Sequence, residues 1–201
     1  MTGADCVVAV MSGNFTQRGE AAILDKWERS RLAVENGVDL VVELPFIYAC
    51  SKAQSFAEGA VDILKGLGVH MISFGSESGE LSDLYEAAAN LIDGSEKIEE
   101  ARERHMKSGI SFAKAGEIAT AEVLGEEAAK LMTEPNNILA LEYLKRLIFW
   151  KERGHDIEAV TVKRHGSGYF EENSEKGFAG ASVIRKMQSS EEFERYVPEN
   201  V

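Results

Sequence analysis

Polar loops that follow apolar runs hold the residues of this chain that could do chemistry, and they span residues 12–19, 45–51, 75–78 and 163–180. The polar side chains and glycines available in these loops are Asn14, Gln17, Arg18, Gly75, Ser76, Arg164, His165, Gly166, Ser167 and Gly168. Backbone N–H groups, helix N-termini and arginine forks are the groups that bind triphosphates and similar anions. These loop residues therefore predict a site for an anionic ligand or a nucleotide.

Several of these residues also fit a purely structural role. Gly75-Ser76 could form an ordinary tight turn, and Asn136-Asn137 could start a helix after Pro135, because asparagine is a favoured N-cap. The run Lys163-Arg164-His165 could be a solvated basic segment, and the acidic residues 94–103 read as the solvated face of a helix. The residue types alone leave both roles open.

No nucleotide or metal motif of established spacing accompanies the loops. The chain contains no P-loop, no G-x-G-x-x-G fingerprint, no nucleophile elbow and no H-E-x-x-H. Cys6 and Cys50 stand among apolar or small residues, which predicts buried, reduced thiols rather than a zinc site. We therefore expect no metal held only by protein ligands.

Apolar runs alternating with helical patterns predict the elements that position the loops. Strands are expected at 7–11, 38–44, 69–74 and 157–162. Helices are expected at 25–36, where Gly37 would end the helix, at 51–67, at 134–153 and at 181–188. Strand-then-helix units predict an α/β fold with a doubly wound parallel sheet. All the loops would then lie at one edge of that sheet.

The same pattern predicts three segments. Residues 1–80 would form the βαβαβ part of a nucleotide-binding domain. Residues 81–134 are helical in pattern and heavily charged, with a break at 108–111, and would form an α-helical insertion. Residues 135–201 would complete the nucleotide-binding domain.

Composition limits the partners of the chain. Its 34 Asp and Glu against 22 Lys and Arg give a net charge of −12, so this chain alone should not be a strong nucleic-acid binder. No apolar run is long enough for a membrane span and no signal-type core precedes the first strand. We expect a cytoplasmic protein with no membrane partner.

Five segments, taken in order, closely resemble one bacterial family, the tRNA(Met) cytidine acetate ligases. They are M-S-G-N-F-T-Q-R-G-E at 11–20, D-L-V-V-E-L-P-F at 39–46, F-G-S-E at 74–77, P-N-N-I-L-A-L-E-Y at 135–143 and A-S-V-I-R-K at 181–186. The resemblance implies a nucleotidyltransferase-like, Rossmann-like fold and an ATP-dependent ligase. Acetate would attack the α-phosphate of ATP to give acetyl-adenylate and pyrophosphate. The acetyl group would then pass to N4 of the wobble cytidine of elongator tRNA(Met).

Carried over position by position, the resemblance implies ATP contacts at Gly75, Asn136 and Arg164, with Arg185 near the phosphates. Gly75 would allow close backbone approach, Asn136 could read a ribose or base edge, and the arginines would offset charge on the leaving pyrophosphate. Mg²⁺ is expected with ATP because the phosphates would supply most of its ligands. The resemblance assigns no catalytic residue within these 201 positions.

The chain departs from the family pattern at both ends. Family members begin earlier, with a strand, a G-x-x-x-x-F-H-x-G-H-type loop and a helix, and they continue past Val201 into a region expected to help hold tRNA. The absent strand would be central to the sheet, so its neighbours would have open edges. We expect this chain, as written, to bind ATP weakly or not at all and to be inactive. The alternatives are a nucleotidyltransferase for a small cofactor and a non-catalytic nucleotide-binding or interaction remnant.

Overall fold

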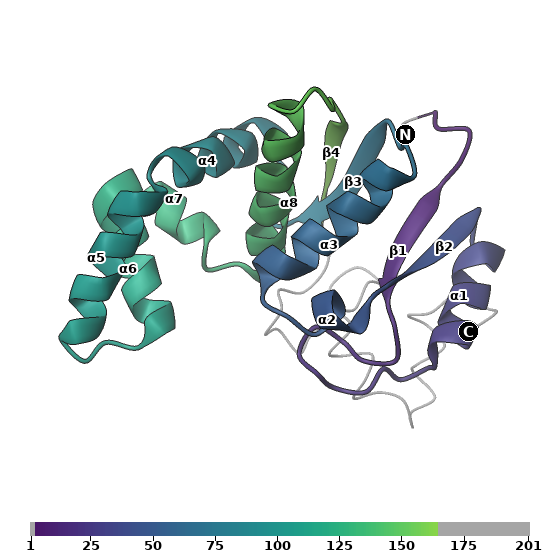
Figure 1. Cartoon of the computed structure of the whole chain (residues 1–201), viewed down its shortest axis with the longest axis horizontal. Helices are drawn as coiled ribbons and strands as arrows, with labels where there is room; N and C mark the ends of the chain where they lie inside the picture. The colour runs from purple at the N-terminus through teal and green to yellow at the C-terminus, as the bar shows by residue number, and fades with distance from the viewer. Residues whose placement is uncertain (1–2, 165–201) are drawn as a thin grey trace. The chain divides into compact units, whose positions relative to one another are not determined.

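The computed structural model describes residues 3–164 of the chain, which Figure 1 shows in colour. The described residues divide into two compact units, one of residues 3–52 and one of residues 53–164. The expected helix at 181–188 with Arg185, and the loop residues from His165 onward, lie outside the described residues.

The first unit is built on two parallel strands. β1 (Val8–Ser12) pairs with β2 (Leu40–Leu44) in a register that runs from Val8 opposite Leu40 to Ser12 opposite Leu44. The connection between them contains α1 (Lys26–Glu35), whose N-cap Asp25 accepts a hydrogen bond from the Glu28 amide at 2.9 Å. Gly37, at φ +99°, follows the C-terminal end of α1 as predicted. The short helix α2 (Phe46–Ala49), which the sequence pattern did not predict, follows Pro45.

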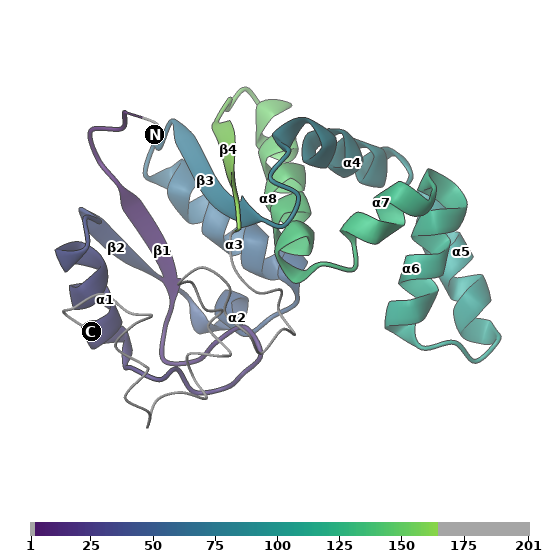
Figure 2. The ribbon, with the colours of Figure 1, turned by 180° about the vertical axis from the view of Figure 1, so that it is seen from behind.

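The second unit also contains a parallel strand pair. It begins with α3 (Ala53–Gly66), which precedes β3 (Met71–Ser76), and β3 pairs with β4 (Glu158–Lys163). The crossover between the two strands contains α4 (Leu81–Asp93) and α8 (Pro135–Lys151). Both views of the ribbon show α3 and α8 side by side next to this strand pair (Figures 1 and 2).

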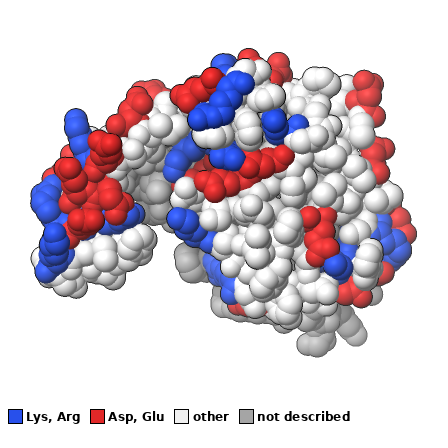
Figure 3. Space-filling model, in the orientation of Figure 1, with Lys and Arg blue, Asp and Glu red and all other residues white. Residues whose placement is uncertain are grey.

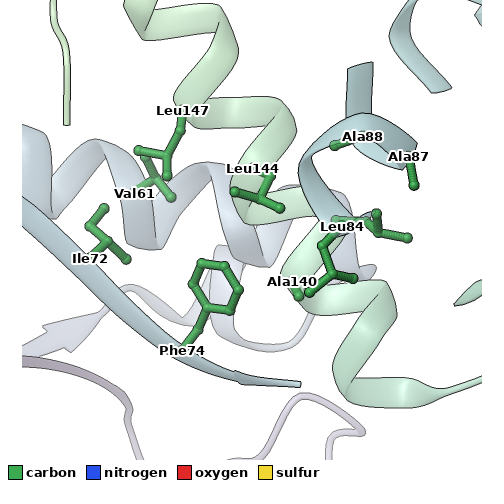
Figure 4. Packing of buried hydrophobic residues seen from close by; sticks show 10 residues of the cluster. Val61, Ile72, Phe74, Leu84, Ala87, Ala88, Ala140, Leu144 and Leu147 are labelled. Atoms are coloured by element: carbon green, nitrogen blue, oxygen red, sulfur yellow. The ribbon is translucent and has the colours of Figure 1, made fainter. Parts of the chain in front are cut away.

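The core of the second unit lies where α3, α4 and α8 meet β3. Val61 of α3, Ile72 and Phe74 of β3, Leu84 of α4 and Leu144 of α8 are buried in one cluster, as Figure 4 shows. Burial of such side chains is worth about 1.5–3 kcal/mol each. This packing fixes the start of α8 against the end of β3, which is where the candidate site lies.

A helical hairpin lies in the middle of the crossover, between α4 and α8. It consists of α5 (Ser95–Lys107) and α6 (Phe112–Leu124), which pack against each other, and is followed by α7 (Glu126–Leu131). The predicted break at 108–111 is confirmed. Lys and Arg alternate with Asp and Glu over this hairpin in Figure 3, and the acidic side chains of 94–103 are exposed, as expected of a solvated helix face.

The α/β class with parallel strands is confirmed, although the described strands form two two-stranded sheets, one in each unit, instead of one continuous sheet. The further central strand that the resemblance implies stays a prediction. The prediction of two buried thiols is wrong for Cys6, which is exposed because it lies in the segment before the paired part of β1; Cys50 is half-buried.

No helix within residues 3–164 is long and apolar enough to cross a membrane. The same residues contain no group of three or more His, Cys, Asp or Glu side chains that could hold a metal ion.

Candidate functional site

The carboxyl ends of β3 and β4 bring two predicted site residues together. The parallel register places Gly75 opposite Val162 and Ser76 opposite Lys163, and the Arg164 amide donates to the Ser76 carbonyl at 3.0 Å. A Cβ on Gly75 would lie 3.5 Å from Cγ of Arg164. Because Gly75 has no side chain, the backbone at the end of β3 stays exposed beside the aliphatic part of the exposed Arg164 side chain. A ligand can therefore approach this backbone closely.

The start of α8 adds the third predicted residue. The side-chain oxygen Oδ1 of Asn136 accepts a hydrogen bond from Nη1 of Arg164 at 3.3 Å. Gly75, Asn136 and Arg164 are distant in sequence, and the structure groups them at one edge of the β3–β4 pair. Parallel pairing of the strands predicted this shared edge for Gly75 and Arg164.

Glu77 joins the end of β3 to α8. Its carboxylate accepts from the Asn136 amide N at 3.2 Å, from Asn136 Nδ2 at 2.6 Å and from the Asn137 amide N at 2.7 Å. These backbone N–H groups belong to the first turn of α8. The N–H groups of a first turn have no acceptors within the helix, and the positive end of the helix dipole lies there. The Glu77 side chain therefore caps a helix to which it does not belong.

Asn137 completes this contact in the opposite direction. Its side chain is fully buried, and its Oδ1 accepts from the Glu77 amide at 3.0 Å and from the Ser78 amide at 3.2 Å. Its Nδ2 donates to the Glu134 carboxylate. We call this set of bonds between residues 77–78 and 136–137 the clamp.

The clamp corrects the expectation that an asparagine caps α8. The N-cap is Glu134, whose side chain makes no capping hydrogen bond, and Pro135 occupies the first turn. Asn136 and Asn137 lie inside the helix, and the carboxylate of Glu77 satisfies their amides. Asn136 thus has a structural bond through Nδ2, and its Oδ1, which accepts one hydrogen bond from Arg164, can accept a second.

Ser76 has a structural role. It is fully buried, its hydroxyl shares a 2.7 Å hydrogen bond with the hydroxyl of Thr161, and it accepts from the Gly79 amide at 3.0 Å. Gly79 has φ +73°, a value that favours glycine. Gly75 and Ser76 are the last two residues of β3 and pair with Val162 and Lys163, so the reading of Gly75-Ser76 as a tight turn is wrong.

The first unit uses Asn14 to hold its own loop. Asn14 Oδ1 accepts from the Lys26 amide at 2.8 Å, and Lys26 Nζ lies 2.6 Å from the carboxylate of Glu43. A Cβ on Gly13 would collide with that carboxylate. Gly13 thus leaves room for the Glu43 side chain of β2, and Asn14 ties the loop after β1 to the start of α1.

Arg29 of α1 reaches the same strand end. Its guanidinium donates to the carbonyl of Ser12 at 2.6 Å and to the carbonyl of Gly13, and burial lowers the pKa of Arg29 below its usual value. The other inventory residues of this loop, Gln17 and Arg18, lie in a turn closed by the Thr16 amide and the Glu20 carbonyl at 2.8 Å.

Sequence reasoning missed Glu77, Asn137, Lys26, Arg29 and Glu43. Glu77 and Asn137 stood inside the F-G-S-E and P-N-N segments, but 60 residues separate their hydrogen-bonded atoms. No periodic spacing signals a contact of that range. A glutamate directly after a strand, together with a second asparagine after a proline, was the only available sign.

Comparison with known proteins gives a match to a family described as HIGH Nucleotidyl Transferase over residues 1–201. Curated relatives include the tRNA(Met) cytidine acetate ligase of a Thermoanaerobacter species, 46% identical over 99% of this chain and 50% of the relative. The enzyme of the same name from Caldicellulosiruptor saccharolyticus is 46% identical over 92% of this chain and 45% of the relative. The chain spans about half the length of the curated relatives it matches.

Solved structures of Thermotoga maritima TmcAL resemble this fold. The apo form matches with a TM-score of 0.84 and 34% identity, covering 98% of this chain and 48% of that chain. A form bound with alpha-thio ATP matches with a TM-score of 0.81 and 33% identity, covering 98% of this chain and 47% of that chain. The fold is therefore of the nucleotidyltransferase-like type, and the resemblance noted from the five sequence segments is confirmed.

Proposed function

Because the chain belongs to the HIGH nucleotidyl transferase family over residues 1–201, we propose that it carries ATP-binding residues of an ATP-dependent ligase. In the proposed reaction, acetate attacks the α-phosphate of ATP, which gives acetyl-adenylate and pyrophosphate. N4 of the wobble cytidine of elongator tRNA(Met) then takes the acetyl group and AMP leaves. The names of the relatives support acetate and tRNA(Met) as substrates.

The observation that carries the proposal is the grouping of Gly75, Asn136 and Arg164 at one strand edge. Gly75 would let the nucleotide approach the backbone, and Asn136 Oδ1 would accept a hydrogen bond from it. Arg164 would lie against the phosphates, where its guanidinium can offset charge that develops on the leaving pyrophosphate. The relative bound with alpha-thio ATP supports a nucleotide at this fold. Arg185, outside the described residues, is proposed as a second phosphate contact.

Mg²⁺ would enter with the nucleotide. The carboxylate of Glu77, which contacts Asn136, already accepts three hydrogen bonds from the start of α8. The ATP phosphates and water would therefore supply most ligands of the ion. Its chemistry would be charge neutralisation on the phosphates.

The tRNA substrate calls for contacts beyond those of this acidic chain. The net charge is −12, and positive and negative side chains are interspersed on the face shown in Figure 3. Long-range attraction to a polyanion is therefore weak. We propose that the C-terminal region of the family contributes to tRNA binding and that the reaction takes place in the cytoplasm.

The first test is stabilisation by Mg-ATP. A ligand at 100 times its dissociation constant adds about 2.7 kcal/mol of stability. Because this chain is expected to bind ATP weakly, millimolar Mg-ATP near the dissociation constant should add only about 0.4 kcal/mol. We expect a correspondingly small rise in the unfolding midpoint, which Arg164→Ala should reduce. Arg153→Ala removes an exposed arginine just after α8, where Arg153 donates to the Phe149 carbonyl at 2.9 Å; it is the matched control and should keep the wild-type rise with Mg-ATP.

A melt that millimolar Mg-ATP leaves unchanged would contradict the proposal and favour a non-catalytic remnant. The acceptor is tested separately by pyrophosphate release. Release with acetate supports the ligase, whereas release with phosphopantetheine or nicotinate mononucleotide in place of acetate would indicate a nucleotidyltransferase for a small cofactor.

A further inference from the structure

We propose that Glu77 is a positioning residue that fixes the side-chain amide of Asn136 with Oδ1 toward the nucleotide. Asn136 would then act as a hydrogen-bond acceptor and select a donor on the ligand. The candidate donors are a ribose hydroxyl and the exocyclic amino group of adenine. This inference rests on the proposed function, in which ATP binds beside Gly75, Asn136 and Arg164.

The charges on either side of Asn136 decide the orientation of its amide. Nδ2 donates to the carboxylate of Glu77 at 2.6 Å, and Oδ1 accepts from the guanidinium of Arg164 at 3.3 Å. A flipped amide would place its oxygen against the carboxylate and its NH₂ group against the guanidinium. Two hydrogen bonds with charged partners would become two repulsive contacts. The observed orientation is therefore strongly preferred.

The Glu77 carboxylate is itself held in place. Besides Asn136 Nδ2 it accepts from the amides of Asn136 and Asn137, so both of its oxygens are engaged. The backbone of Glu77 is bonded to Oδ1 of the fully buried Asn137. Rotation of Glu77 away from Asn136 would break these bonds together.

The same contacts exclude one alternative for the nucleotide. The first N–H groups of a helix often bind phosphate, but at α8 two of them already donate to Glu77. A phosphate there would also meet the negative charge of that carboxylate. The phosphates are therefore expected to lie beside Arg164, and Asn136 is expected to contact the nucleoside part of ATP.

An acceptor placed in this way gives discrimination between nucleotides. A site built to bond a substrate donor rejects an analogue that lacks it, because the acceptor is then left unpaired. Among 2′-deoxy-ATP, 3′-deoxy-ATP and purine riboside triphosphate, we expect one to bind wild type about three- to tenfold more weakly than ATP.

The test compares Glu77→Gln with Glu80→Gln. Both remove one negative charge from the same loop, but the Glu80 side chain is exposed and makes no capping hydrogen bond to α4. We expect Glu77→Gln to lower ATP affinity severalfold and to reduce the discrimination between ATP and the deficient analogue to about one. Glu80→Gln should keep the wild-type ATP affinity and the wild-type discrimination between ATP and the deficient analogue. A merely structural role of Glu77 would weaken all nucleotides equally and leave that ratio unchanged.

A second readout does not depend on ATP. In ¹H–¹⁵N spectra, one of the two side-chain amide protons of Asn136 should be shifted downfield and protected from exchange. Glu77→Gln should abolish both the shift and the protection. If wild type bound no ATP while this signal was present, the proposed function would fail and the orientation would stand. If ATP bound and Glu77→Gln retained wild-type discrimination, the positioning role would be overturned.

Discussion

Replacing Asn137 by alanine should destabilise the second unit more than any conservative change on its surface. Asn137 is fully buried at the start of α8, and its Oδ1 is the partner of two backbone amides, those of Glu77 and Ser78. Its Nδ2 also donates to Glu134. Alanine removes all three bonds and offers no substitute.

The magnitude follows from the groups left behind. A hydrogen bond contributes about 0.5–1.5 kcal/mol net, and a buried donor left without a partner costs about 1–3 kcal/mol. Two amides lose their partner, and water can reach the partly exposed Ser78 side of the loop. The expected loss of unfolding free energy is therefore about 2–4 kcal/mol. In urea, with a slope of about 1–3 kcal/mol per molar, the midpoint should fall by roughly 1–2 M.

The two tryptophans allow each unit to be followed separately. Trp27 lies in the first unit and is 75% exposed, so Trp27→Phe should cost little. In that background Trp150 of α8, whose indole donates to Asp62 at 2.6 Å, reports on the second unit alone. Urea unfolding followed by Trp150 fluorescence then measures the effect of Asn137→Ala where it acts.

Asn90→Ala is the matched control. Asn90 lies exposed in α4, where alanine is the better helix former and should stabilise by a few tenths of a kcal/mol. If Asn137→Ala changed the urea midpoint no more than Asn90→Ala does, the clamp would not hold β3 to α8.

Other predictions concern the same unit. Gly79→Ala should cost about 1–3 kcal/mol, because φ is +73° and the new Cβ would lie 2.6 Å from that of Lys163; Gly109→Ala, at φ +89° with no atom within 4 Å, should cost less in the same urea assay. Asp62→Ala should cost about 1–3 kcal/mol, since a guanidinium and an indole N–H lose their acceptor; an unchanged Trp150 urea midpoint would contradict this. Burial raises the pKa of Tyr143 to about 12, whereas the unfolded phenol ionises near pH 10. Its contribution to stability is therefore complete below about pH 10 and is lost as pH rises toward 12, and Tyr143→Phe should remove this loss in unfolding curves across that range.

The sequence predicted the regular elements well because their signals are local. Apolar runs indicated all the described strands to within about two residues, and Gly37 marked the end of α1. The short helix α2 escaped because four residues carry no period. The burial of Cys6 was predicted wrongly, because apolar neighbours in the sequence do not show at which residue strand pairing begins.

The candidate site was predicted only in outline. Parallel pairing explains why Gly75 and Arg164 meet, since the ends of adjacent parallel strands share an edge. Asn136 came from the family resemblance and not from spacing. The role of Glu77 could not be predicted, because it depends on how α8 packs against β3 across some 60 residues of intervening chain.

A ¹H–¹⁵N titration of the labelled chain with Mg-ATP tests whether Gly75, Asn136 and Arg164 form an ATP-binding site. This measurement detects even millimolar affinity. If they do, the signals of the Gly75 and Arg164 amides and of the Asn136 side chain should shift progressively and saturate, and Arg164→Ala should diminish these shifts. Spectra that stay unchanged at millimolar Mg-ATP, or shifts confined to the α5–α6 hairpin, would contradict an ATP-binding site at these residues.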